Sequence, residues 1–373
     1  MRKLLAFLTY TVGLALVRIA GPKPASSWFR RASRLDSRND RALHYSAWSL
    51  WESGELEEAA AQYHQLLARL PQFSGAWLEL ARVLQGLGRH EKALDAVERA
   101  LPREPHNAVL HYTRGESLVA LGRMAQAIDA YRQAIQLDPA YADALGNLGA
   151  ALGSLRRWHE AVRWNAEAMK LKPSVVHAHN LGVALAELGR FQEAEEAFKL
   201  AVSLEPSSAE LQARLALAIA AQGRVADGLH TLEGALAIDP SNIAVRTSLS
   251  SLLVGEGRAQ EAIEVALETV RLHVDNWQAH AALGWAYFQA DLPQAGLAAF
   301  EIGVRLQPDV PETLAGYAAC LSRLGRHDEA IEAFRRVLVA DPDYLHRDEV
   351  AAQYFDTSKR SMVGPPDPGH STT

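Results

Sequence analysis

Proline and glycine recur in this chain at a fixed interval, and this constrains its fold more than any other feature. The proline series is regular except for one step that is a residue shorter and one position that holds valine: Pro71, Pro105, Pro139, Pro173, Pro206, Pro240, Val274, Pro308 and Pro342. A second series lies 17 residues before the first and consists of glycine at all but two positions: Gly54, Gly88, Gly122, Arg156, Gly189, Gly223, Gly257, Asp291 and Gly325. The period is 34 residues, and a fixed period of this length is the signature of a repeat architecture. The short step places one missing residue between Pro173 and Gly189, in a loop or a first helical turn.

Each repeat is predicted to form two helices of about 12 to 14 residues. Between the marker positions, apolar residues recur at helical spacing, as at Leu145, Leu148 and Leu152. Glycine near the middle of the repeat ends the first helix, and proline near its end stops the second. A helix pair of this size cannot bury both of its faces alone, so neighbouring repeats must stack.

The pattern inside the repeats resembles that of the tetratricopeptide repeat (TPR) family. Repeat three fills the family's small, aromatic and proline positions with Gly115, Ala127, Tyr131, Ala134 and Pro139. The resemblance covers about four-fifths of the chain and implies an all-α fold, a right-handed TPR solenoid of helix-turn-helix repeats. Nine repeats are predicted over residues 40–344, at 40–73, 74–107, 108–141, 142–174, 175–208, 209–242, 243–276, 277–310 and 311–344.

A few positions depart from the repeat pattern, and the chain continues beyond the last repeat. Asn165 replaces the large apolar residue of repeat four, and Gly228 and Gly296 replace the alanine of the second helix, so looser joints are expected there. After Pro342, the spacing of Ala351, Ala352 and Phe355 predicts a polar capping helix at 345–363. Residues 364–373 are predicted to be a disordered tail.

Charge divides the chain into two parts with different expected partners. The formal net charge is −6, but residues 1–41 hold nine basic and two acidic side chains, a net charge of +7. The remainder holds 29 basic and 42 acidic side chains, a net charge of −13. An acidic body argues against nucleic acid as a partner, because neutralising phosphates needs a basic face. The basic residues instead flank the most apolar segment of the chain.

Residues 1–21 form an apolar segment with three possible interpretations. Leu4 to Val17 contains no charge, after a basic start at Arg2 and Lys3. A cleaved secretory signal fits the basic start and the short apolar run, but Arg18 and Pro22 disfavour a cleavage site between them. A membrane-spanning helix fits the segment from Leu4 to Gly21, which is close to the length that a bilayer requires. A soluble capping or interfacial helix would leave apolar residues on every face.

We favour the uncleaved membrane anchor among these interpretations. Residues 22–39 are then a basic linker, and the basic side chains from Arg18 to Arg41 suit an anionic membrane surface. More lysine and arginine lie after the apolar run than before it, which places the repeats on the cytoplasmic side. The alternative is export of a soluble protein after signal cleavage.

No catalytic, metal or cofactor motif is found in the sequence, so we interpret the chain as non-catalytic. It has no phosphate-binding glycine loop and no serine nucleophile elbow. Its one cysteine, Cys320, rules out an intramolecular disulfide and any zinc site that needs two thiolates. Apolar neighbours predict that Cys320 is a buried and inert thiol.

The TPR resemblance implies that the first helices of the repeats line a concave groove in which peptides or partner helices bind. Candidate groove residues are aromatic or polar side chains expected on this face: Tyr45, Trp48 and Trp51 in repeat one, Trp285 and Phe288 in repeat eight, and a polar fringe of Arg82, Tyr112, Glu116 and Arg214. Aromatic residues often dominate binding energy at such surfaces. Alternatively, a preceding helix containing Trp28 and Phe29 covers the first aromatic cluster.

Two specialised forms of the family are not matched by these residues. The positions that would form a carboxylate clamp of lysine, arginine and asparagine hold His44, Trp48, Leu78, Arg82, Tyr112 and Glu116. Of an asparagine ladder, only Asn147 and Asn180 are present. The sequence therefore predicts a membrane-tethered scaffold that binds protein or peptide partners. The alternatives are an exported binding module and a regulatory subunit of an envelope or secretion enzyme complex.

Overall fold

The computed structural model describes residues 1–36, 38–342 and 344 of the chain. Twenty α-helices and no strand are found in this part, which confirms the predicted all-α solenoid of TPR-like helix pairs. The predicted capping helix at 345–363 and the predicted tail at 364–373 lie outside the described residues.

Eighteen of the helices pair off as the nine predicted repeats. The first helices of the repeats are α3 (Asp40–Glu52), α5 (Ser74–Gly86), α7 (Ala108–Ala120), α9 (Ala142–Ser154), α11 (Val175–Glu187), α13 (Ala209–Ala220), α15 (Ile243–Gly255), α17 (Trp277–Gln289) and α19 (Pro311–Arg323). The second helices are α4 (Leu56–Arg69), α6 (His90–Ala100), α8 (Met124–Leu137), α10 (Trp158–Leu171), α12 (Phe191–Leu204), α14 (Val225–Ile238), α16 (Ala259–Leu272), α18 (Pro293–Leu306) and α20 (His327–Ala340). Repeating helix pairs of this kind are what a solenoid requires.

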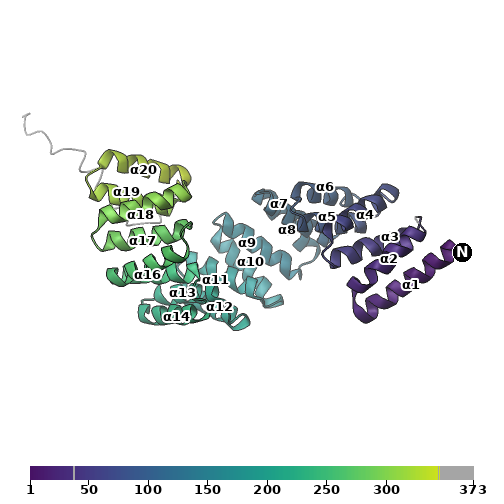
Figure 1. Ribbon diagram of the computed structural model, residues 1–373, viewed down its shortest axis with the longest axis horizontal. Helices are drawn as coiled ribbons and strands as arrows, with labels where there is room; N and C mark the ends of the chain where they lie inside the picture. The colour runs from purple at the N-terminus through teal and green to yellow at the C-terminus, as the bar shows by residue number, and fades with distance from the viewer. Residues whose placement is uncertain (37, 343, 345–373) are drawn as a thin grey trace, which may run out of the picture. The chain divides into compact units, whose positions relative to one another are not determined.

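The helices belong to two compact units, residues 1–188 and the described residues of 189–373. The boundary falls inside repeat five, between α11 and α12. Within each unit, a helix packs against the helices next to it in the chain, as Figure 1 shows. First helices of successive repeats also touch, as α5 touches α7 and α13 touches α15.

The small and aromatic positions of the repeat form the core together. Tyr131 of α8 lies so close to α7 that a Cβ atom added at Gly115 would be 2.4 Å from the Tyr131 ring. Phe300 of α18 approaches Gly284 of α17 in the same way, at 2.7 Å. A large side chain on the second helix therefore needs a small one on the first, which explains the spacing of the two residue types. Asn165 takes the aromatic position in repeat four and is 1% exposed.

The turn inside each repeat requires a left-handed backbone conformation. All nine positions of the glycine series have a positive φ, between 58° and 83°. Arg156 and Asp291, the two positions without glycine, both have φ of 58°. A residue just after a helix commonly adopts this conformation, and glycine adopts it at the least cost. The repeat thus keeps the backbone conformation even where it lacks glycine.

The sequence interpretation of residues 22–39 as a linker is corrected by the structure. Most of this segment forms α2 (Pro22–Leu35), which makes a helical hairpin with α1 (Arg2–Ala20) around Gly21. Its prolines do not prevent the helix, because proline in the first turn removes only N–H groups that have no partner within the helix. α2 buries Ala25, Phe29 and Ala32 on one face and packs against both α1 and α3.

Candidate functional site: the first helices of the repeats

Four of the predicted groove residues occupy the same position in their repeats. Each directly follows a buried alanine or glycine at the small position of its repeat, and each is partly buried: Trp48, Arg82, Glu116 and Trp285. Because the preceding small residue faces the core, the next residue is turned about 100° away from it around the helix. These side chains therefore lie at the border between the core and the surface of the first helices.

A polar cluster lies across the first helices of repeats two, three and four. It consists of Arg82, Tyr112, Glu116, Tyr141 and Asn147. The Asn147 side-chain amide donates a hydrogen bond of 3.2 Å to the Tyr112 hydroxyl. The Tyr112 and Tyr141 rings lie 4.9 Å apart between centroids. Three of the predicted groove residues thus come together here, while Tyr141 was missed because it precedes α9 in a loop.

Burial and charge set the electrostatics of the polar cluster. Burial raises the pKa of the Glu116 carboxyl, whereas the Tyr112 hydroxyl and the Arg82 charge act to lower it. Burial also raises the pKa of Tyr112. Arg82 has no hydrogen bond or ion pair with any residue that the structure describes. A partly buried guanidinium is therefore left with its donors available.

A hollow of about 330 Å³ adjoins the polar cluster. Its lining is mainly apolar, with Glu116 and Asn147 shared with the cluster: Glu116, Val119, Met124, Tyr131, Asn147, Ala150, Ala151 and Ser154. Ligand sites commonly combine an apolar hollow with a few placed polar groups. The cluster and the hollow together can accept an apolar side chain beside a charged or hydrogen-bonding group.

The N-terminal hairpin covers part of the aromatic cluster in repeat one. The Tyr45 ring stacks on Phe29 of α2, with centroids 5.4 Å apart, and lies 5.8 Å from Tyr10 of α1. Trp51 is partly buried against the core of the first repeats. The Trp48 and Tyr45 rings meet edge to face, with centroids 6.2 Å apart. The covering helix considered from the sequence is therefore present over Tyr45.

The two aromatic residues of repeat eight differ in exposure. Phe288 is 5% exposed, and the Arg323 guanidinium lies 4.4 Å from its ring centroid, so Phe288 belongs to the core. Trp285 is partly buried and meets Phe300 edge-on at 5.4 Å. It also lines a hollow of about 220 Å³ with Thr247, Ser250, Ser251, Val254 and Ala282. Arg214, the remaining predicted residue, is exposed on α13.

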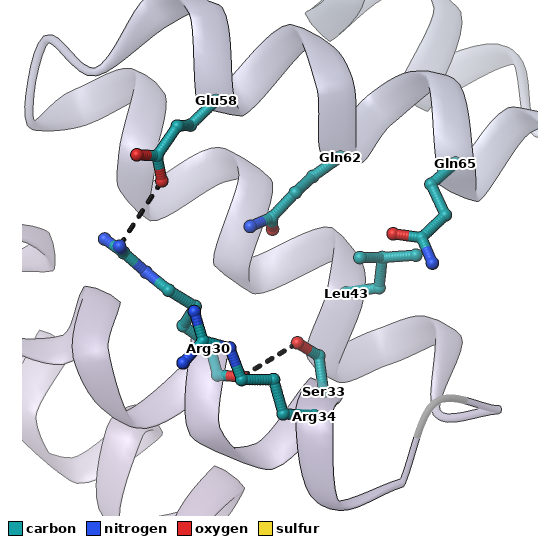
Figure 2. A pocket seen from close by; sticks show the side chains of 7 residues that line it. All are labelled: Arg30, Ser33, Arg34, Leu43, Glu58, Gln62 and Gln65. Carbon is teal, nitrogen blue, oxygen red and sulfur yellow. Dashed lines mark hydrogen bonds and ion pairs between the residues drawn. The ribbon is translucent and has the colours of Figure 1, made fainter.

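A third hollow, of about 310 Å³, lies where α2 meets α3 and α4 (Figure 2). Arg30, Ser33 and Arg34 of α2 line it, together with Leu43 of α3 and Glu58, Gln62 and Gln65 of α4. The Arg30 guanidinium reaches Glu58 at 3.3 Å and Glu55 at 3.4 Å. The sequence did not point to this site because residues 22–39 were interpreted as a basic linker, and a helix containing Trp28 and Phe29 was considered only as an alternative. The apolar spacing of Ala25, Phe29 and Ala32 was the available signal.

Two other titratable side chains, Cys320 and Glu195, are buried in surroundings that indicate a structural role. Cys320 is fully buried, which raises the pKa of its thiol to about 12. Glu195 of α12 is 4% exposed and accepts hydrogen bonds from Lys199 and Gln222 at 2.7 Å and from Arg224 at 3.1 Å. Lys199 and the other partners lower the pKa of Glu195 to about 2. No group of three or more metal-ligating side chains is found among the described residues.

These helix pairs, and the polar positions that they align on their first helices, define an all-α helical-repeat protein. The chain belongs to the tetratricopeptide repeat family. Family models described as TPR repeat or tetratricopeptide repeat match residues 50–115, 115–155, 142–172, 185–252, 248–311 and 282–344. None of the curated proteins compared with the chain matches it.

Solved TPR structures resemble this chain in fold. A tetratricopeptide repeat protein from Parabacteroides merdae is 15% identical, with a TM-score of 0.52, over 66% of this chain and 98% of that one. MamA from Desulfovibrio magneticus is 20% identical, with a TM-score of 0.43, over 44% and 94% of the two chains. YrrB, described as a TPR protein with an unusual peptide-binding site, is 20% identical, with a TM-score of 0.44, over 49% and 95%.

Proposed function

We propose that this protein is a non-catalytic scaffold that binds protein partners or peptide segments on the first helices of its repeats. The observation that carries the proposal is Arg82, a partly buried cation that makes no hydrogen bond or ion pair with the described residues. Its charge acts on the carboxyl of Glu116, which lines an apolar hollow. Hydrogen-bond donors that are partly shielded from water gain from a ligand that supplies acceptors for them.

The polar cluster suits an extended peptide segment with mixed chemistry. A carboxylate or main-chain carbonyl of the segment would accept hydrogen bonds from Arg82. Amide groups of the segment would meet Glu116 and Asn147, and an apolar side chain would enter the hollow lined by Val119 and Met124. Trp285 in the second unit offers a separate aromatic contact beside its own hollow.

The same proposal includes attachment to a membrane through residues 1–21, with the repeats on the cytoplasmic side. Among the described residues, α1 alone is long and apolar enough to cross a membrane, with a mean hydropathy of 1.6, and a signal sequence passes the same test. Cleavage after α1 would uncover Phe29, which is 0% exposed, and the Tyr45 ring stacked on it. This packing supports a retained N-terminal segment over an exported, processed protein.

Site-dependent capture of partners tests the proposed binding function. Tagged wild-type protein, Arg82→Ala and Glu116→Gln are used to capture proteins from the source cell, and captured proteins are quantified by mass spectrometry. We expect each change to lower capture about tenfold, since a charged hydrogen bond contributes about 1.5–3 kcal/mol. His230→Ala is the matched control, because this α14 side chain is 91% exposed.

Circular dichroism of each variant shows whether its helices are intact. Equal capture by wild type, Arg82→Ala and Glu116→Gln would reject the polar cluster as the binding site. Loss of capture by His230→Ala as well would reject it too, because the effect would then not depend on the site.

A further inference from the structure

We propose that α1 and α2 dock on an anionic bilayer surface as a folded hairpin, with α1 lying in the plane of the interface instead of crossing the membrane. The inference rests on the proposed membrane attachment and specifies its form. Three observations carry it: the packing of α1 on α2, the apolar outer face of α1, and the charge of the hairpin.

The inner face of α1 is engaged by protein. Ala6, Thr9 and Gly13 are buried on this face. Gly13 meets the Phe29 ring so closely that a Cβ atom there would lie 2.7 Å from it. The hairpin is joined to repeat one as well, because the Ser49 hydroxyl donates a hydrogen bond of 2.6 Å to the Pro22 carbonyl. α1 is therefore one layer of the folded unit.

The outer face of α1 is apolar and uncovered. Its exposed large apolar residues are Leu4, Leu5, Phe7, Leu8, Val12 and Ile19. Arg18 is exposed and follows Leu4 by fourteen residues and Thr11 by seven, so helical periodicity places it on the same face. A long basic side chain there can extend to the headgroups while its stem covers apolar surface. The face of α1 that α2 leaves uncovered is thus apolar, with Arg18 as a single basic side chain among its exposed residues.

The charges on α2 distinguish docking from crossing. α2 packs along α1 and carries Lys23, Arg30, Arg31 and Arg34. If the intact hairpin crossed the bilayer, these side chains would enter hydrocarbon, where charged groups are strongly disfavoured. If α1 crossed alone, it would leave Phe29 without the Gly13 contact and without Tyr10, 5.8 Å away. An in-plane hairpin avoids both costs.

The charge of the hairpin also favours an anionic bilayer, and not a second copy of the chain, as the partner that covers the outer face of α1. Of the nine basic side chains before residue 42, only Arg30 is ion-paired within the described residues. The two acidic side chains are both engaged: Asp40 pairs with Arg69 at 2.8 Å, and Asp36 accepts a hydrogen bond from the Arg38 amide. Two such hairpins would repel each other, whereas anionic lipids attract the unpaired cations.

Depth measurements on membrane-bound protein test the in-plane orientation. Single spin labels are placed by Leu4→Cys, Leu8→Cys, Val12→Cys and Ile19→Cys in the full chain, which is bound to vesicles of phosphatidylcholine and phosphatidylglycerol. The native Cys320 is fully buried, and label-treated wild type controls for its reaction. Leu4 and Ile19 are about 22 Å apart along a helix. We expect all four labels at similar shallow depths, with a label at Ser27→Cys of α2 outside the hydrocarbon.

The result that overturns the in-plane orientation is a depth profile that is shallow at both ends and deepest at positions 8 and 12. A crossing helix would place its middle about 15 Å below the interface. We also expect binding to fall in pure phosphatidylcholine vesicles and at high salt, because exposed charges are screened. Equal binding to both vesicle types would overturn the role of the basic residues.

Two further outcomes separate this inference from the proposed function. Failure to bind either vesicle would overturn both the in-plane hairpin and the proposed membrane attachment, while partner capture through Arg82 would be tested independently. A dimer in solution that Leu8→Glu converts to a monomer would show that a second copy covers α1, and this would overturn the membrane as its occupant.

Discussion

Replacement of Phe29 by alanine is predicted to loosen the N-terminal hairpin and leave the repeats folded. Phe29 is 0% exposed and joins three elements: its ring packs on Gly13 of α1, lies 5.8 Å from Tyr10 of α1, and stacks on Tyr45 of α3. Truncation removes a fully buried ring between the hairpin and repeat one. Because protein interiors are close-packed, the cavity left by the ring costs stability unless the helices move to close it.

The expected magnitude follows from the burial of this ring. Truncating a buried phenylalanine to alanine costs about 3–5 kcal/mol. The hairpin lies at the end of its unit and can partly close the gap, so we expect about 3 kcal/mol, which is roughly a hundredfold in the local opening equilibrium. Repeats couple chiefly to their neighbours, so α7 and α8 should not be affected.

Hydrogen exchange of the full chain, followed by mass spectrometry, measures this effect directly. Peptides from α1 and α2 should exchange roughly a hundredfold faster in Phe29→Ala, with α7 and α8 unchanged. Trp28→Ala is the matched control, because Trp28 is adjacent but partly exposed, and it should change exchange much less. If α1 exchanges equally in wild type and Phe29→Ala, α1 does not depend on packing with α2, and the hairpin argument fails.

Three further predictions concern the repeats. Arg156→Gly should stabilise the first unit by about 1 kcal/mol in urea unfolding, because φ is 58° at this position, and a loss of stability would contradict the strain argument. Glu195→Gln should destabilise the second unit by about 2 kcal/mol at neutral pH. Since the pKa of Glu195 is lowered to about 2, wild type should be more stable than Glu195→Gln above pH 4.5, and this difference in stability should vanish as the pH falls toward 2. A stability difference that does not depend on pH would refute this prediction. Exposed Glu193→Gln is its control. Finally, Phe288→Ala should lower the melting temperature far more than Trp285→Ala, while only Trp285→Ala should lower partner capture with the fold intact; equal melting temperatures would contradict the burial of Phe288.

The repeated helix pairs were predictable because their signals are local. Glycine, proline and apolar spacing recur at fixed positions, and the turn conformation follows them even at Arg156 and Asp291. A helix containing Trp28 and Phe29 was only an alternative to the basic linker, because this segment lacks the repeat pattern and begins with two prolines near basic residues. Its apolar positions Ala25, Phe29 and Ala32 have helical spacing, but charge dominates the composition of the segment.

The candidate site was predictable only in part. Arg82, Tyr112 and Glu116 were found from the family's first-helix positions, and contacts between repeats bring them together. The burial of Phe288 was not predictable, because Trp285 and Phe288 are neighbours on the surface of one helix and its spacing does not say which of them the next repeat covers. Which edge is covered depends on the neighbouring repeat, here through Arg323 of α19. Tyr45 is likewise covered by α2, a helix that the sequence offered only as an alternative to a linker.

The neighbour-only packing of the helices has a consequence for biosynthesis. Inside each unit, the substantial contacts of a helix are with helices one or two places away in the chain. Such contacts close only short loops, so their entropic cost is small and folding is fast. A nascent chain folds as it emerges, N-terminal part first. α1, α2 and α3 can therefore assemble while later repeats are still being translated, and the apolar face of α1 is presented to its surroundings before the binding surface of repeats two to four exists.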